Sequence, residues 1–278
     1  MLFRSELVFM SFDAELRAAL DLAAADKCKE ALDSFERIRS RNISADQAGA
    51  VLLNEAKCLQ ELGRFADARE RLKDARRLLG QIKLIGQSVN FEIYLEFTEI
   101  FLIFAEGKRL QGIERGKAFL AKYEKDLRKD DYSDVNYELS LRIAFELVSA
   151  EQFESGVQAL VSFLPYAKDE DHARILLFLG IANEKLGNHD QAIDKFKRIL
   201  QSSGPEDMVV QAHYHLGAIY WKSGAAAWAK QHFLEALNLR NDLANVPLRD
   251  LYTFLANASG HLGQEEEREK YLGLARSC

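Results

Sequence analysis

Two stretches of the chain repeat one arrangement of residues at a fixed distance. Four positions share an offset of 37 residues: Gly180/Gly217, Ala192/Ala229, Phe196/Phe233 and Ile199/Ala236. In each stretch the apolar and small residues follow helical spacing on both sides of a short break, which predicts two amphipathic helices joined by a turn. Neither helix can bury its apolar stripe alone, so consecutive helix pairs must stack on one another. This pattern predicts an all-α repeat protein.

The small residue of the second helix provides an anchor for aligning the rest of the chain. Six of its positions carry alanine or glycine, namely Ala31, Ala68, Gly112, Gly156, Ala192 and Ala229. The seventh position is occupied by a large residue, Arg268. They predict seven antiparallel helix pairs, with residues 1–10 as an N-terminal extension. The expected units span about 11–45, 46–86, 87–130, 131–168, 169–205, 206–245 and 246–278, within a single solenoid.

The order of residues within a unit resembles the tetratricopeptide repeat family. That pattern has a large apolar residue, Leu-Gly and Tyr in the first helix, then Ala, Phe and Ala in the second. The matching residues of the sixth unit are Leu216, Gly217, Tyr220, Ala229, Phe233 and Ala236. Residues 59–72, LQELGRFADARERL, form another family-like signature. The resemblance implies a right-handed superhelical solenoid whose first helices line the concave side.

The third unit departs from this pattern. Its first helix, about 88–106, is almost entirely apolar, and we expect Tyr94, Phe97 and Phe101 to face inward, because other registers would bury glutamates without an evident partner. Its second helix is expected over residues 108–129 and contains Gly112 and Gly116. Each glycine inside a helix costs about 1 kcal/mol relative to alanine. Close backbone packing is the expected compensation.

Composition argues against several classes of protein. The net charge of −6 gives no support to broad nucleic-acid binding. No run approaches the roughly 20 apolar residues that span a bilayer, and Glu6 interrupts the apolar start, unlike a signal peptide. The three cysteines (Cys28, Cys58 and Cys278) are widely spaced, so neither a disulfide framework nor a zinc site is indicated. A cytoplasmic protein is expected.

The sequence contains no recognisable catalytic motif. Its glycines belong to no phosphate-binding loop. His213 and His215 are two residues apart, which puts them on different faces of a helix and makes them a poor metal pair. No serine, cysteine or carboxylate pair stands in a recognisable catalytic setting. We therefore expect no enzyme activity, no cofactor and no metal; a helical enzyme and an RNA-binding repeat are the disfavoured alternatives.

A cluster of basic residues occupies the second helix of the third unit. Its members are Lys108, Arg109, Arg115, Lys117, Lys122, Lys125, Arg128 and Lys129, interspersed with Glu114, Glu124 and Asp126. The cluster either docks an acidic partner or anionic surface or is a solvated face with local ion pairs, which is the interpretation we favour.

The family resemblance implies a concave groove that holds an extended peptide or a helix of another protein. The groove positions carried onto this chain are Asn54, Lys57, Glu96, Glu99, Arg142, Phe145, Arg174, Phe178, Ile181, Lys185, Tyr214, His215, Trp221, Lys222, Thr253 and Asn257. Phe145 and Phe178 fit the groove and packing against neighbouring repeats equally well. Tyr214 and Trp221 favour the groove, because Tyr and Trp are enriched at binding hot spots.

Two functions follow from the resemblance. The first is a non-catalytic scaffold or adaptor that binds a protein segment in the groove; the alternative is a peptide-sensing regulator whose superhelix changes pitch on binding. The family's carboxylate clamp is incomplete, since Asn54 and Lys57 have suitable chemistry but the next two units supply Glu96, Glu99 and Phe145. Binding of a chaperone tail is therefore not predicted. A homo-oligomer is compatible with the sequence.

Overall fold

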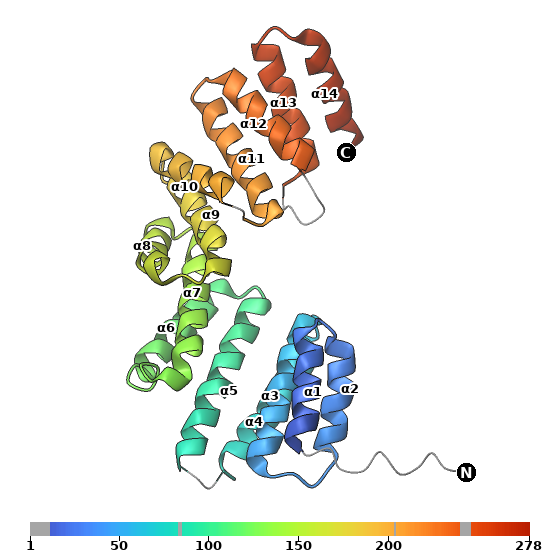
Figure 1. Ribbon diagram of the computed structural model, residues 1–278, viewed down its shortest axis with the longest axis vertical. Helices are drawn as coiled ribbons and strands as arrows, with labels where there is room; N and C mark the ends of the chain where they lie inside the picture. The colour runs from blue at the N-terminus through green and yellow to red at the C-terminus, as the bar shows by residue number, and fades with distance from the viewer. Residues whose placement is uncertain (1–11, 83–84, 203, 240–245) are drawn as a thin grey trace, which may run out of the picture. The chain divides into compact units, whose positions relative to one another are not determined.

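The computed structural model describes residues 12–82, 85–202, 204–239 and 246–278, and the regular structure within these ranges is entirely helical (Figure 1). The α-helices are α1 Phe12–Ala24, α2 Cys28–Arg39, α3 Ala45–Glu61, α4 Phe65–Leu79, α5 Ile85–Ala105, α6 Arg109–Lys122, α7 Ser133–Ser149, α8 Phe153–Phe163, α9 Asp169–Lys185, α10 His189–Gln201, α11 Glu206–Lys222, α12 Ala226–Leu239, α13 Leu248–His261 and α14 Glu265–Ser277. Short 3₁₀ turns lie at Asp130–Tyr132 and Leu164–Tyr166. The all-α fold of seven helix pairs is confirmed. The expected extension, residues 1–10, lies outside the described residues.

The chain divides into two compact units, Met1–Ile143 and Ala144–Cys278, and the division falls within α7. In the N-terminal unit each helix from α1 to α6 packs against the next, and α3 also contacts α5. In the C-terminal unit the same holds from α8 to α14, and α9 also contacts α11. This is the stacking that a helix-pair repeat requires. That both units belong to one continuous solenoid stays a prediction.

The turn inside each helix pair contains one residue with a left-handed backbone. These residues are Asp26, Gly63, Gly107, Glu151, Gly187, Gly224 and Gly263. Each lies five residues before one of the seven anchors, so the turns recur at the spacing of the aligned positions. Asp26 and Glu151 adopt φ values of 60° and 61° despite carrying side chains, which is the conformation that glycine takes without steric cost.

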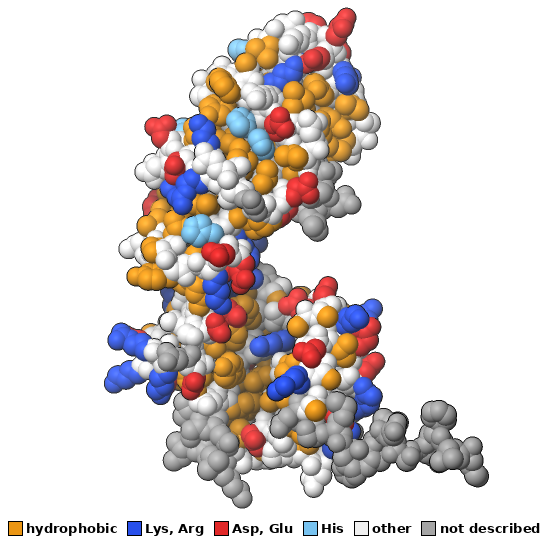
Figure 2. Space-filling view, viewed as in Figure 1, with side chains coloured by type: hydrophobic (Ala, Val, Ile, Leu, Met, Phe, Trp, Pro, Cys, Tyr) orange, Lys and Arg blue, Asp and Glu red, His pale blue; other side chains and the backbone are white. Residues whose placement is uncertain are grey.

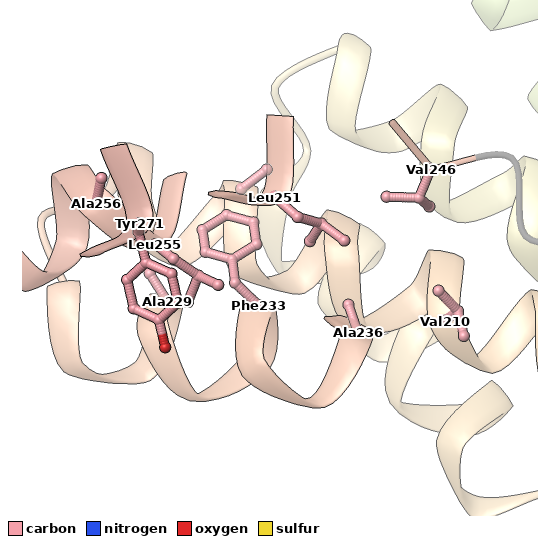
Figure 3. Close-up of a cluster of buried hydrophobic side chains, with 10 residues drawn as sticks. Val210, Ala229, Phe233, Ala236, Val246, Leu251, Leu255, Ala256 and Tyr271 are labelled. Carbon is pink, nitrogen blue, oxygen red and sulfur yellow. The ribbon is translucent and has the colours of Figure 1, made fainter. Parts of the chain in front are cut away.

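In the sixth pair, α11 and α12 pack closely where a glycine meets an aromatic ring. A Cβ atom added to Gly217 would lie 2.7 Å from the ring of Phe233, which is fully buried. Figure 3 shows this ring beside Leu251 and Leu255 of α13, so Phe233 joins two consecutive pairs in one core. The fifth pair repeats the contact with Gly180 and Phe196.

The third pair differs from expectation in two respects. Phe97 is buried as predicted, but Tyr94 is 38% exposed and Phe101 only half-buried. The buried side chains of α5 are instead Phe91, Ile93, Leu95, Phe97, Thr98, Ile100, Leu102 and Phe104. Helix α5 packs against α3, α4 and α6, and this broad buried surface leaves no single apolar stripe from which to read the register. Helix α6 ends at Lys122 rather than near residue 129; turns then follow, in which Leu127 and Tyr132 are buried.

None of the described helices combines the length and apolar character needed to cross a membrane.

Candidate interaction face on the first helices

In the N-terminal unit, several of the predicted groove residues are held by contacts inside the protein. The Nδ2 group of Asn54 donates a hydrogen bond to the carbonyl of Ala50 at 2.8 Å, within its own helix. The guanidinium of Arg142 lies 5.2 Å from the centre of the Phe104 ring. Lys57 is exposed. These residues do not form a continuous apolar surface.

The two glutamates of α5 that were predicted to lie in the groove face second helices. Glu96 accepts a hydrogen bond from Lys122 of α6 at 2.7 Å, and Glu99 pairs with Arg76 of α4 at 2.6 Å. Partial burial would lower the pKa of Lys122, but its hydrogen bonds, with that to Glu96 first, outweigh burial and raise it. Both predicted groove glutamates are therefore paired with cations of second helices. Their place in a groove stays a prediction.

In the C-terminal unit, the predicted residues on α7 and α9 contact one another. Phe145 is only 4% exposed, and its ring centre lies 4.6 Å from that of Phe178. The guanidinium of Arg174 lies 4.5 Å from the centre of the Phe145 ring. Phe145 is thus covered and packs beneath two residues that remain accessible, of which Phe178 is half-buried and Arg174 exposed.

A buried carboxylate that the sequence analysis missed links α9 to α11. Glu184 has Oε2 2.8 Å from Nδ1 of His215 and Oε1 2.9 Å from Nζ of Lys222. Burial alone would raise the pKa of Glu184, but hydrogen bonds and charge from His215 and Lys222 outweigh it and lower this pKa to about 2. The spacing in the sequence could have indicated this contact. Lys222 follows Glu184 by 38 residues, which is close to one repeat, so both side chains lie at the interface between α9 and α11.

Aromatic side chains continue this surface from α11 to α13. Tyr214 meets the ring of Phe254 edge-on at 6.0 Å, and Trp221 meets His261 in the same way at 5.7 Å. Tyr214 and Trp221 are both half-buried, with part of each ring accessible. We call the accessible surface of these helices the C-terminal first-helix face. It comprises Arg174, Phe178, Ile181, Lys185, Tyr214, His215, Trp221, Lys222, Thr253 and Asn257.

A pair of histidines lies elsewhere, between α11 and α12. The Nδ1 atoms of His213 and His232 are 2.9 Å apart, and Tyr220 stacks on His232. Burial lowers the pKa of both histidines, that of His232 to about 4. Across the described residues, no group of three or more His, Cys, Asp or Glu side chains is arranged to hold a metal ion.

The fold and these contacts define a class of helix-pair repeat protein, and the comparisons with known proteins agree. Residues 210–243 match the family model described as tetratricopeptide repeat. No curated protein sequence matches the chain. This match and the repeats described above confirm the resemblance to the tetratricopeptide repeat family that the sequence indicated.

Solved structures share the fold at low sequence identity. The apo form of RapI has a TM-score of 0.75 and 15% identity, over 95% of this chain and 75% of that one. The apo form of the quorum sensor NprR from B. thuringiensis gives 0.72 and 13%, over 95% and 74%. NprR in complex with its cognate peptide NprX gives 0.63 and 13%, over 98% and 79%. Identities this low establish the fold alone.

Proposed function

We propose that this protein is a non-catalytic interaction protein whose C-terminal first-helix face binds an extended peptide or a helix of a partner protein. The observation that carries the proposal is the row of half-buried apolar side chains on consecutive first helices. Phe178 and Ile181 lie on α9, and Tyr214 and Trp221 lie on α11. Such side chains already have their rings or branches fixed by packing, so binding would order little of the protein.

The expected affinity follows from the apolar area. Burying one large apolar side chain gains about 1.5–3 kcal/mol. Four such contacts at the upper value gain about 12 kcal/mol. Less a cost of about 4 kcal/mol for association and ordering, this leaves about 8 kcal/mol, which corresponds to a dissociation constant near 1 μM.

The polar groups of the face support a specific rather than a purely apolar contact. The buried carboxylate of Glu184 orients His215 and Lys222, and the guanidinium of Arg174 packs over the ring of Phe145. Polar side chains that are oriented before binding can pair with backbone carbonyls or side chains of a ligand at low entropic cost. The similarity in fold to NprR in complex with its cognate peptide supports a peptide ligand.

Selection of binders from a random peptide library, with the full chain as target, tests the proposal. A selected peptide is labelled with a fluorophore, and its dissociation constant is measured by anisotropy. Combining Tyr214→Ala with Trp221→Ala should weaken binding by about a thousandfold, since each is expected to act as a hot spot of about 2 kcal/mol and about 1.4 kcal/mol corresponds to a factor of ten. Trp228→Ala is the matched control: Trp228 is 59% exposed but lies on the second helix α12, outside the face. Equal binding by wild type and the double variant, with helicity retained, would remove the proposal.

The second candidate is a peptide-sensing regulator in which binding changes the arrangement of the repeats. The fold shared with NprR, which has been solved both as an apo form and with a peptide, favours this alternative. Small-angle scattering with and without the selected peptide distinguishes the two. A regulator of this kind changes its radius of gyration on binding, whereas a rigid scaffold keeps it.

A further inference from the structure

The first two helix pairs are joined by a buried carboxylate between two arginines. Glu55 of α3 is 2% exposed and lies between Arg39 of α2 and Arg71 of α4. The N–O distances are 3.2 Å to Arg39 and 2.7 Å to Arg71. Both arginines close on one carboxylate, so the negative charge of Glu55 is paired within the protein.

The next interface repeats the same three residues one unit later. Arg76, Glu99 and Arg115 follow Arg39, Glu55 and Arg71 by 37, 44 and 44 residues, which are the offsets of the corresponding anchors. Arg76 binds Glu99 through two hydrogen bonds of 3.1 and 2.6 Å. Arg115 differs from its counterpart Arg71, because it is exposed and makes no ion pair with any residue in the described part of the chain. The second Arg–Glu–Arg site is therefore open.

A cavity of about 260 Å³ lies at this open site, between α4, α5 and α6. Its residues are Arg69, Leu72, Lys73, Arg76, Glu99, Leu102, Ile103, Glu106 and Arg115. Leu72 and Leu102 are buried and Ile103 is half-buried, which provides an apolar lining. The volume is slightly below the range for small-ligand pockets, about 300–1,000 Å³. It has room for one or two side chains rather than for a cofactor.

The negative charge of the cavity lining is shielded, whereas its positive charge is accessible. The side chain of Glu106 is 7% exposed and is held by Lys108 at 2.8 Å and by Arg69. Burial would raise the pKa of Glu106, but the contacts with Lys108 and Arg69 outweigh it and lower this pKa, so the carboxylate stays charged. The side chain of Arg76, in contrast, is 46% exposed. The lining thus has four cations against two shielded carboxylates, in a protein whose net charge is −6.

Arg115 also belongs to the basic cluster between Lys108 and Lys129, and most other cations of that cluster have partners. Lys122 contacts Glu92 and Glu96, Arg128 pairs with Glu124, and Lys129 pairs with Asp126. Figure 2 shows Lys and Arg side chains gathered over the end of α6, where these local ion pairs lie. Arg115 is the member that lines the cavity.

We infer that this cavity binds a peptide segment that carries a carboxylate beside an aliphatic or aromatic side chain. The ligand carboxylate pairs with Arg115 and with the free donors of Arg76, as Glu55 pairs with both arginines of the closed site. The apolar side chain lies against Leu72, Leu102 and Ile103. The planar guanidinium, with its several N–H donors, suits a carboxylate, and the apolar lining requires a ligand that is more than a simple anion.

The probe is a fluorophore-labelled peptide of alternating aspartate and leucine, titrated with the full chain. Two control peptides replace aspartate by asparagine or leucine by serine. The probe should bind, both control peptides should bind at least about tenfold more weakly, and the affinity should fall as salt rises. Failure of the probe to bind, or equal binding by either control peptide, would overturn the inference.

Two charge reversals on the same helix locate the site. Arg115→Glu should weaken probe binding by at least about tenfold, because it places a carboxylate against the ligand's own. Lys117→Glu makes the same change of charge two residues away, at an exposed position that does not line the cavity, and should leave binding within about twofold. Equal loss in both variants would indicate a general charge effect and contradict the site.

A variant of the C-terminal first-helix face separates this inference from the proposed function. The Tyr214→Ala and Trp221→Ala double variant should bind the probe as the wild type does, since the cavity lies within the N-terminal unit. If that double variant loses the probe while Arg115→Glu retains it, the probe binds the C-terminal first-helix face and the cavity has no such role.

Discussion

The third and sixth helix pairs bring their helices together in opposite ways. In the sixth pair the glycine is on the first helix and the ring on the second: a Cβ at Gly217 would lie 2.7 Å from Phe233. In the third pair the glycine is on the second helix and the ring on the first: a Cβ at Gly112 would lie 2.4 Å from Phe104. A close helix pair therefore requires a small residue facing a large one, whichever helix supplies each.

The inversion explains why the third pair fits the family pattern poorly. Gly116 lies four residues after its anchor, where the sixth pair has Phe233. The space is filled instead by Ile143, whose Cδ1 would be 2.8 Å from a Cβ at Gly116. A side chain from α7 therefore fills the space beside this glycine, where the sixth pair has the ring of its own second helix.

Removing the ring should produce the largest effect in either pair. Phe233→Ala and Phe104→Ala each create a cavity in a buried core and should lower the free energy of unfolding by about 3–5 kcal/mol. Urea denaturation followed by circular dichroism measures both losses. A loss below about 1 kcal/mol at Phe104 alone would show that the inverted contact does not hold the third pair together.

The two pairs also differ in how they hold a carboxylate. The third pair binds Glu96 through its own second helix, whereas α11 of the sixth pair binds Glu184 of the preceding pair. The pKa of Glu184 falls from its ordinary value of 4.5 to about 2 on folding. Because this pKa is lowered, the charged carboxylate of Glu184 adds to the free energy of unfolding. This contribution is complete above about pH 4.5 and is lost as pH falls towards 2. At about 1.4 kcal/mol per pKa unit, it amounts to about 3 kcal/mol.

Glu184→Gln tests this contribution. The variant should be about 3 kcal/mol less stable than the wild type at neutral pH, and the difference should shrink as pH falls from 4.5 to 2. Urea denaturation at a series of pH values gives the difference directly. Lys222→Met leaves His215 in place, so its loss should be smaller. A difference that does not change with pH would mean that the charge of Glu184 does not stabilise the fold.

The sequence predicts the repeats where small and aromatic residues recur at one offset, as at Gly217 and Phe233. It also predicts the first helix pair, since the anchor Ala31 supplies its position. It does not predict the exposure of Tyr94, because an almost wholly apolar helix has no stripe that marks its inner side. Nor does it predict the role of Glu184, because a buried carboxylate depends on cations that approach from another helix.

Adding a methyl group should have a smaller effect than removing a ring. Gly112→Ala and Gly217→Ala place a Cβ within 3 Å of a buried ring, and each should lower the free energy of unfolding by about 1–3 kcal/mol. The loss is opposed by the better helix propensity of alanine, about 1 kcal/mol. If the two losses agree within about 1 kcal/mol, the two arrangements are equally tight. A stabilised Gly112→Ala would show that the ring of Phe104 moves aside freely.

Gly273→Ala isolates the backbone component of these glycine substitutions. Gly273 lies inside α14, and a Cβ added there would meet no atom within 4 Å. Alanine should therefore stabilise the protein by about 0.5–1 kcal/mol, because it loses less conformational freedom on folding and meets no ring. Subtracting this gain from the results at Gly112 and Gly217 gives the cost of crowding alone in each pair. Should Gly273→Ala destabilise the protein instead, alanine would be unfavourable in these helices for reasons other than contact, and the losses at Gly112 and Gly217 could no longer be assigned to Phe104 and Phe233.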